Sequence, residues 1–137
     1  HKGIVEDHKS SGVWVCTATG STSAMSSAGG LIQDLDDQRL HWRVRELFRE
    51  PAYDRAKSRA AWDHADFFFD ANDDVVVTSK MREGRVWLDG PHCGVDLPMG
   101  ARLVLHGRCP PLSLYATAAM AARRVEARNE AKARVLA

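Results

Sequence analysis

The chain has 137 residues, a length that fits one domain or part of a larger protein. Lys and Arg total 19 and Asp and Glu total 18, so the formal net charge is +1. This near-balance argues against a protein whose main role is to coat nucleic acid or a membrane surface. No apolar run approaches the ~20 residues needed to span a bilayer. We therefore expect a folded protein with no nucleic-acid and no membrane partner.

The cysteines indicate the compartment. Cys16, Cys93 and Cys109 form no paired spacing and no C-x-x-C motif, which predicts an intracellular protein, cytoplasmic or organellar. The N-terminus has neither an initiator Met nor the apolar core of a signal peptide, so we expect the chain to start inside a longer protein. The six histidines are scattered, and we expect no structural metal site.

The first half of the chain predicts strands and short helical segments. Residues 13–16 form a β-rich run typical of a buried strand, and residues 24–28 could make a helical turn. Residues 40–45 alternate apolar and polar side chains, which predicts a half-buried strand whose polar side carries His41. Residues 52–64 have helical composition, and the three phenylalanines at 67–69 are expected to pack inward.

From residue 74 the pattern changes to short strands separated by Gly/Pro turns. Four strands are predicted, at residues 75–79, 85–89, 103–107 and 112–115. Together with the earlier runs they favour a mainly β (α+β) fold, an antiparallel sheet or a β-sandwich-like domain.

The last residues predict a helix because residues 116–137 are rich in Ala, Arg and Glu and contain no Gly or Pro. We divide the chain into a β-rich domain, residues 1–115, and this helical tail. The helix carries four arginines that we interpret as a solvated face: Arg123, Arg124, Arg128 and Arg134.

One segment carries chemistry: residues 17–30, which we call the hydroxyl loop. It follows the first strand, is dense in Ser and Thr, and has Gly20 near its middle. Hydroxyl groups both donate and accept hydrogen bonds, and glycine lets a ligand approach the backbone, so the loop suits a ribose or phosphate ligand. It lacks the spacing of a Walker loop or a Rossmann fingerprint. The alternative is a surface turn with local side-chain to backbone hydrogen bonds.

Acidic residues just after this loop admit a second interpretation. Asp34, Asp36 and Asp37 could bind Mg²⁺, but a solvated acidic turn is the favoured reading of the three side chains.

The hydroxyl loop resembles a signature of the ATP-NAD kinases. Residues 12–22, GVWVCTATGST, followed by S-A-G-G at 27–30, are similar to that family's strand, T-P-T-G-S-T-A-Y loop and S-A-G-G turn. Residues 40–51 resemble the strand ending in V-R-E-P of the plant-type NADH kinase branch. Weaker similarity follows in order at residues 83–90, 100–105 and 111–112, so the resemblance covers about residues 10 to 115.

The resemblance implies that the chain is the C-terminal, β-rich segment of a kinase that phosphorylates the 2′-hydroxyl of NAD or NADH. ATP and Mg²⁺ would be required, and a homo-oligomer is implied. By the same match, six residues would contact the dinucleotide: Thr19, Gly20, Ser21, Thr22, Ser23 and Ser27.

Two departures and one absence limit what carries over. Ala24 replaces the family's Tyr, as in the plant-type branch, and Ser11 replaces an Asp, which leaves NAD versus NADH preference open. The family's G-G-D-G and N-E motifs do not precede the loop, so the catalytic residues are unknown and we expect no turnover by this segment alone. The alternatives are a non-catalytic dinucleotide-binding or assembly module, and a lipid kinase of the same superfamily.

Overall fold

A computed structural model describes residues 3–48, 64–113 and 115–136 of the chain. The helix expected at residues 52–64 lies outside the described residues, except for His64, which is in a turn.

The centre of the molecule is an antiparallel sheet in the order β1-β2-β3, formed by β1 (Gly12–Cys16), β2 (Leu40–Arg45) and β3 (Asp66–Phe69). β1 and β2 are runs that the sequence predicts as strands, whereas β3 contains the phenylalanine run, which was expected to pack inward and was not predicted as a strand. The register sets Val15 opposite Trp42, and Trp42 opposite Phe67. Residues directly opposite in an antiparallel pair lie on the same face, so each face of the sheet carries one alternating set of side chains.

The second half of the chain forms two-stranded ribbons. In one, β4 (Val75–Thr78) pairs with β7 (Arg102–Leu105), and in the other β5 (Arg85–Trp87) pairs with β6 (Gly94–Asp96). Three of these strands agree with the predicted runs, but β6 has no clear pattern in the sequence and was not predicted.

The strand predicted at residues 112–115 is wrong for the described residues of that segment, because residues 112, 113 and 115 have no regular structure. Leu112 and Tyr115 are both strongly exposed. Pro110 and Pro111 stand just before this segment and lack the N–H groups that a ladder needs, and no strand of the described residues pairs with it.

The hydrophobic core lies between the three-stranded sheet and the β4–β7 ribbon. Its buried members are Trp42, Val44, Phe69 and Val75, and Val13, Val15, Phe67 and Leu105 pack around them. Phe67 and Phe69 lie with ring centroids 6.0 Å apart, a spacing typical of favourable aromatic pairs. The inward packing expected for the phenylalanine run is therefore confirmed for Phe69, which is fully buried, whereas Phe67 and Phe68 are half-buried.

The opposite face of the sheet corrects the interpretation of His41. The alternating pattern of β2 places His41 away from the core, and we expected that side to face water. His41 has instead 0% of its surface exposed. The first helical segments pack against β1 on this side, and the Phe68 ring stacks on the imidazole at 4.4 Å, so both faces of β2 are covered.

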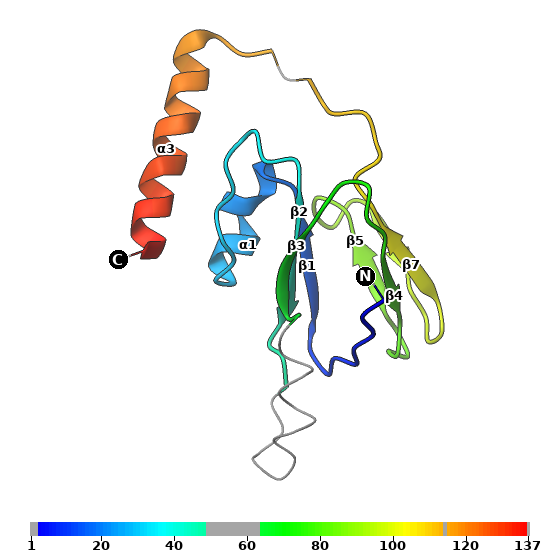
Figure 1. The fold of residues 1–137 in the computed structure, drawn as a ribbon. Coiled ribbons are helices and arrows are strands. Elements are labelled where there is room, and N and C mark those ends of the chain that lie inside the picture. The colour runs from blue at the N-terminus through cyan, green and yellow to red at the C-terminus, as the bar shows by residue number, and fades with distance from the viewer. Residues whose placement is uncertain (1–2, 49–63, 114, 137) are drawn as a thin grey trace.

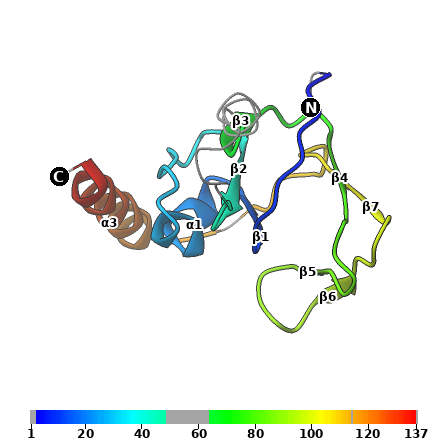
Figure 2. The ribbon, with the colours of Figure 1, turned by 90° about the horizontal axis from the view of Figure 1, so that it is seen from below.

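The helices lie on one side of the sheet. They are the 3₁₀ turn η1 (Thr19–Thr22), the short helix α1 (Ala24–Ser27) and the C-terminal helix α3 (Ala118–Leu136). Both the helical turn at 24–28 and the helix in the tail agree with the sequence prediction. Figure 1 shows α3 beside α1, connected to β7 by a long segment that passes over the sheet. Viewed from below, α3, α1, the sheet and the β4–β7 ribbon follow one another across the molecule (Figure 2).

The described residues form a mainly β structure of three small sheets with one long helix, which confirms the expected fold class at that level. Within them, no helix is both long and apolar enough to cross a membrane.

We expect Phe69→Ala to lower the free energy of unfolding by about 3–5 kcal/mol, because truncating a fully buried phenylalanine removes apolar contacts and leaves a cavity. Urea denaturation followed by tryptophan fluorescence would measure the change. Val104→Ala is the control, because Val104 is half exposed on β7 and its truncation should cost far less. Equal losses in the two variants would show that the core does not lie where we place it.

Candidate functional site

The hydroxyl loop begins where β1 ends at Cys16, and it turns back over the non-core face of the sheet. Residues 19–22 form η1, residues 24–27 form α1, and the S-A-G-G turn then leads into the segment 31–39 before β2. Small side chains dominate this path, which lets the backbone coil tightly. The loop therefore lies between the sheet on one side and α3 on the other, as Figure 1 shows.

The structure places the six predicted contact residues in two environments. Ser21 is fully buried, with 0% of its surface exposed. The side chains of Thr19, Thr22, Ser23 and Ser27 are exposed, and Gly20 is half-buried. The six residues thus share one short segment, but Ser21 points into the protein whereas the other four side chains point outward.

Local hydrogen bonds occupy part of the loop's hydroxyl groups. Ser21 Oγ donates to Ala18 O at 2.7 Å, Ser23 Oγ to Gly20 O at 2.7 Å, and Ser26 Oγ to Ser23 O at 3.1 Å. These are the bonds expected of a Ser/Thr-rich surface turn. Among the six predicted contact residues, the hydroxyl groups of Thr19, Thr22 and Ser27 make no hydrogen bond within the described residues, and the exposed Ser23 hydroxyl group donates locally but can still accept from a ligand.

Glycine is needed at Gly20 and Gly29 because the loop lies close to the sheet. A Cβ added at Gly20 would meet the Cβ of Cys16 at 3.0 Å. Gly29 has a positive φ of 81°, and an added Cβ would lie 3.0 Å from the Arg43 guanidinium. A larger residue at Gly20 would crowd the Cys16 side chain of β1, and one at Gly29 would be strained by the positive φ.

Beneath the loop, the sheet carries a polar row of His41, Arg43 and Asp66. His41 Nε2 lies 2.5 Å from Asp66 Oδ1, and Arg43 also donates to the Asp66 carboxylate. A His–Asp pair can act as a general base in an enzyme, but His41 is out of contact with solvent, so no substrate reaches it in this structure. We therefore assign the row a structural role in supporting the loop and the S-A-G-G turn.

Cys16 lies on the same covered face, directly opposite His41 in the register. Burial raises the pKa of the Cys16 thiol to about 11. A thiol with so high a pKa is protonated at neutral pH and is a poor nucleophile, so Cys16 and His41 do not make a catalytic pair.

The segment after the loop is held by a second group of polar contacts. Gln33 Nε2 donates to Arg39 O at 2.9 Å, and the Arg39 side chain donates to both oxygens of Asp37. The hydrogen bond from Arg39 holds the pKa of Asp37 well below its usual range, although partial burial opposes this, and Asp37 in turn raises the pKa of Arg39. A pocket of about 320 Å³ lies beside these residues and is also lined by Phe68 and Lys132.

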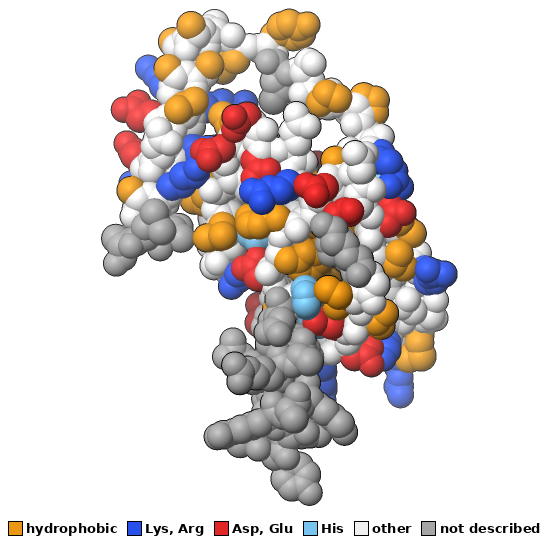
Figure 3. Space-filling model, in the orientation of Figure 1, with side chains coloured by type: hydrophobic (Ala, Val, Ile, Leu, Met, Phe, Trp, Pro, Cys, Tyr) orange, Lys and Arg blue, Asp and Glu red, His pale blue; other side chains and the backbone are white. Residues whose placement is uncertain are grey.

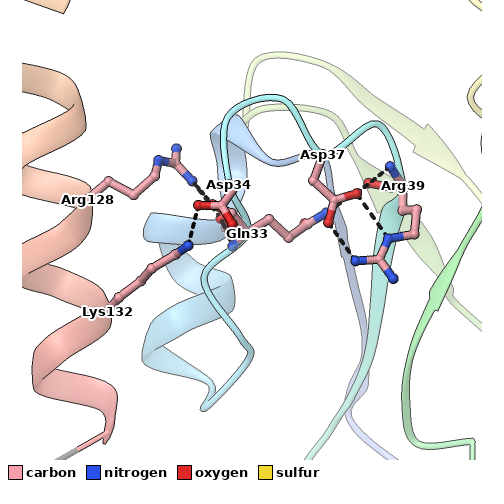
Figure 4. A network of polar contacts seen from close by, with 7 residues as sticks. Gln33, Asp34, Asp37, Arg39, Arg128 and Lys132 are labelled. Atoms are coloured by element: carbon pink, nitrogen blue, oxygen red, sulfur yellow. Dashed lines mark hydrogen bonds and ion pairs between the residues drawn. The ribbon is translucent and has the colours of Figure 1, made fainter. Parts of the chain in front are cut away.

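Helix α3 reaches this region through two side chains that Figure 4 shows pointing at the segment. Arg128 Nη1 donates to Ala18 O, Ser21 Oγ and Gln33 O at 2.8, 3.1 and 2.6 Å, and Lys132 Nζ pairs with Asp34 Oδ1 at 2.5 Å. The interpretation of the four tail arginines as a solvated face is therefore wrong for Arg128, which is only 7% exposed. Nothing in the helix sequence distinguishes Arg128 from the others, because its partners lie about a hundred positions away in the chain.

Two of the three carboxylates of the acidic segment form ion pairs with cations. Asp34 pairs with Lys132 and Asp37 with Arg39, while Asp36 is exposed. In the described part of the chain, no three His, Cys, Asp or Glu side chains are grouped so that they could hold a metal ion. The residues described here thus do not fit a Mg²⁺ site.

Comparison with known proteins finds relatives among plant enzymes. The chain is 32% identical over 107 residues to a protein named NADH kinase from Arabidopsis thaliana, covering 78% of this chain and 31% of that protein. It is 27% identical over 106 residues to a probable NADH kinase from Oryza sativa subsp. japonica, covering 77% of this chain and 30% of the relative. The chain thus spans about a third of the length of the curated relatives it matches. No family model matches it, and no solved structure matches it.

Ser21→Ala is expected to lower the free energy of unfolding by about 1–3 kcal/mol, because it leaves the buried Gln33 N–H without its acceptor and removes one acceptor of Arg128. Denaturant unfolding measures the effect. The matched control is Ser27→Ala, an exposed serine of the same loop, for which the change should stay within about 0.5 kcal/mol. A Ser21 variant as stable as the Ser27 variant would contradict the assigned role.

The raised pKa of Cys16 predicts that iodoacetamide at pH 8 modifies the exposed Cys93 and Cys109 well before Cys16. The thiolate is the reacting form, so the Cys16 rate should rise about tenfold for each pH unit up to its pKa of about 11. Peptide mass spectrometry over time would measure the three rates, with the urea-unfolded chain as control. Equal rates in the folded chain at pH 8 would show that Cys16 is not covered as described.

Proposed function

Because the chain is related in sequence to the plant NADH kinases, we propose that it is part of an NAD(H) kinase and supplies contacts to the dinucleotide. The parent reaction transfers the terminal phosphoryl group of ATP to the 2′-hydroxyl of NAD(H) and yields NADP(H). The new bond joins phosphorus to the 2′-oxygen, the bond to the ADP oxygen breaks, and the hydroxyl proton passes to a base. No described residue of this chain is assigned as that base.

The observation that carries the proposal is the set of unoccupied hydroxyl groups on the segment whose motif resembles the ATP-NAD kinase signature. Thr19, Thr22 and Ser27 are exposed and keep their hydrogen-bonding capacity free within the described residues. Hydroxyl groups of this kind can donate to phosphate oxygens and accept from ribose hydroxyls. Gly20 stands between Thr19 and Thr22 and is half-buried, so its backbone is the part that would meet the ligand.

The buried Ser21 supports the loop from below instead of touching the ligand. Its hydroxyl group donates to Ala18 O and accepts from Gln33 N at 3.0 Å and from Arg128, which uses its hydrogen-bonding capacity in full. Of the six contact residues predicted from the resemblance, we therefore propose that Thr19, Thr22, Ser23 and Ser27 contact the ligand by side chain and Gly20 by backbone.

ATP and Mg²⁺ belong to the proposed reaction of the parent protein. The carboxylates near the loop are paired with Lys132 and Arg39, so we assign no step of the metal chemistry to them. We propose that the hydroxyl loop contacts the dinucleotide. Residues other than those described here would then activate the phosphate.

The surface of the ribbons favours further protein contacts. Trp87, Leu88, Val95 and Met99, on or next to β5 and β6, are each more than half exposed. Figure 3 shows hydrophobic side chains scattered over the face of the molecule that carries the ribbons. We infer that these ribbons belong to a larger, β-sandwich-like C-terminal domain and pack against the rest of a homo-oligomeric kinase.

A non-catalytic dinucleotide-binding or assembly module is the second candidate, because the loop could hold NADH without turnover. A lipid kinase of the same superfamily is less favoured, since both plant relatives carry the name NADH kinase.

Isothermal titration of the chain with NADH and NADPH tests the proposal. We expect saturable binding that Thr22→Val weakens by about tenfold, the loss of one hydrogen bond worth ~1.4 kcal/mol. Thr78→Val is the control, because Thr78 is an exposed threonine of β4, outside the hydroxyl loop. Identical affinities for wild type and Thr22→Val would remove the loop from the binding site.

A parallel assay with ATP, Mg²⁺ and NADH separates the two candidates in the parent protein. Turnover by the longer protein with none by these 137 residues is the result expected of a kinase segment. Phosphorylation of a lipid but not of NADH by the longer protein would replace the proposal with the lipid-kinase alternative. Turnover by this chain alone, abolished by Gly20→Val, would show that the catalytic groups lie within it.

A further inference from the structure

Arg128 joins two parts of the candidate site through a single nitrogen, which donates to three acceptors. The two N–H groups of Nη1 are shared among Ala18 O, Ser21 Oγ and Gln33 O. Ala18 and Ser21 belong to the start of the hydroxyl loop, and Gln33 lies after the S-A-G-G turn, so the guanidinium closes the loop at both ends. Figure 4 shows the side chain extending from α3 toward Gln33, well away from the helix axis.

These contacts determine the shape of η1. Ala18 O accepts from Ser21 N at 3.3 Å and from Ser21 Oγ at 2.7 Å as well as from Arg128, so the guanidinium holds the carbonyl on which the 3₁₀ turn is built. The exposed hydroxyl groups of Thr19 and Thr22 stand on that same turn. Losing the Arg128 contact would therefore free the backbone that orients them.

The charge of Arg128 faces neutral groups only. All three acceptors are carbonyl or hydroxyl oxygens, and no carboxylate of the described residues pairs with this side chain. The nearby Asp34 carboxylate pairs with Lys132 instead, so the positive charge of Arg128 is hydrogen-bonded at the base of the loop without an ion-pair partner among the described residues. A ligand with a pyrophosphate group, such as a pyridine dinucleotide, would be attracted to that charge.

The remainder of α3 adds little to its attachment. Among its described side chains Arg128 is the one that is buried, Ala131 and Lys132 are half-buried, and Met120 and Val125 are about half exposed. Acidic and basic side chains adjoin one another where the helix meets the rest of the molecule (Figure 3), which matches the Lys132–Asp34 pair. Among the helix side chains that the structure describes, the attachment is thus made by polar contacts centred on Arg128 and not by an apolar face.

We propose that Arg128 is a positioning residue, which holds the hydroxyl loop in its ligand-binding shape so that docking of α3 and binding of the dinucleotide favour each other. The coupling rests on the proposed function, whereas the attachment of the helix to the loop does not. By linkage, a ligand that prefers the ordered loop also strengthens the attachment of α3.

The test compares Arg128→Gln, Arg128→Lys and the control Arg124→Gln in the full chain. Arg124 is an exposed arginine of the same helix, so its replacement removes a charge without removing a loop contact. Two quantities are measured for each variant. One is hydrogen exchange at the Ser21 and Gln33 amides without ligand, and the other is NADH affinity by titration.

We expect Arg128→Gln to speed exchange at the two loop amides and to weaken NADH binding by about tenfold, equivalent to ~1.4 kcal/mol. Exchange at the Val44 amide, which donates to Ala65 O in the core, should not change, and this distinguishes local loosening from global unfolding. Arg128→Lys keeps a charged donor and should recover part of both losses. Arg124→Gln should match the wild type.

Unchanged loop exchange in Arg128→Gln would overturn the positioning role, and so would unchanged affinity for NADH. Absence of NADH binding by the wild type would overturn the proposed function and the coupling together, while faster loop exchange in the variant would still establish the attachment. If Arg128→Gln also loses protection at Val44, the variant is unfolding globally and Arg128→Lys becomes the deciding variant. Arg128→Lys that keeps Val44 protected but exchanges at Ser21 and Gln33 as fast as Arg128→Gln would contradict the proposal.

Discussion

The hydroxyl group of Ser21 is the point on which the candidate site depends. It lies out of reach of water, donates to Ala18 O and accepts from Gln33 N and from Arg128. A buried hydroxyl costs free energy unless it is hydrogen-bonded, and here every one of its capacities is met. Because the buried Ser21 hydroxyl group anchors the loop to the protein, the exposed hydroxyl groups beside it face solvent.

The central sheet serves the site with one face and the core with the other. Trp42 and Val44 pack toward the β4–β7 ribbon, while His41 and Arg43 alternate with them along β2 and face the loop. The strict alternation of a β-strand makes this division possible. The Asp66 carboxylate on β3 forms hydrogen bonds with both His41 and Arg43. Hydrogen bonds therefore stabilise the covered polar face of the sheet, whereas apolar contacts stabilise the core face.

Much of the fold could be predicted from the sequence because strands and helices leave local patterns. The runs at β1, β2, β4 and β7 and the alanine-rich α3 were found in this way. The burial of His41 could not be found, since a strand with a polar side gives no sign that a loop will cover that side. Arg128 was missed for the same reason: its three acceptors lie 95 to 110 positions away, and a helix with several arginines does not show which of them turns inward. The loop itself was recognisable because glycine and hydroxyl residues cluster there.

The β4–β7 ribbon has a consequence for any work with this chain by itself. Each of its strands pairs with the other and, within the described residues, with no further strand. Val76 and Val104 face each other across the ribbon, and each is a little under half exposed. Edge strands with unpaired backbone groups and exposed valines can pair with the strands of a second copy of the protein. Protein concentration would then govern whether the molecule stays dispersed in solution, and charged replacements at these two valines would be the natural way to keep it so.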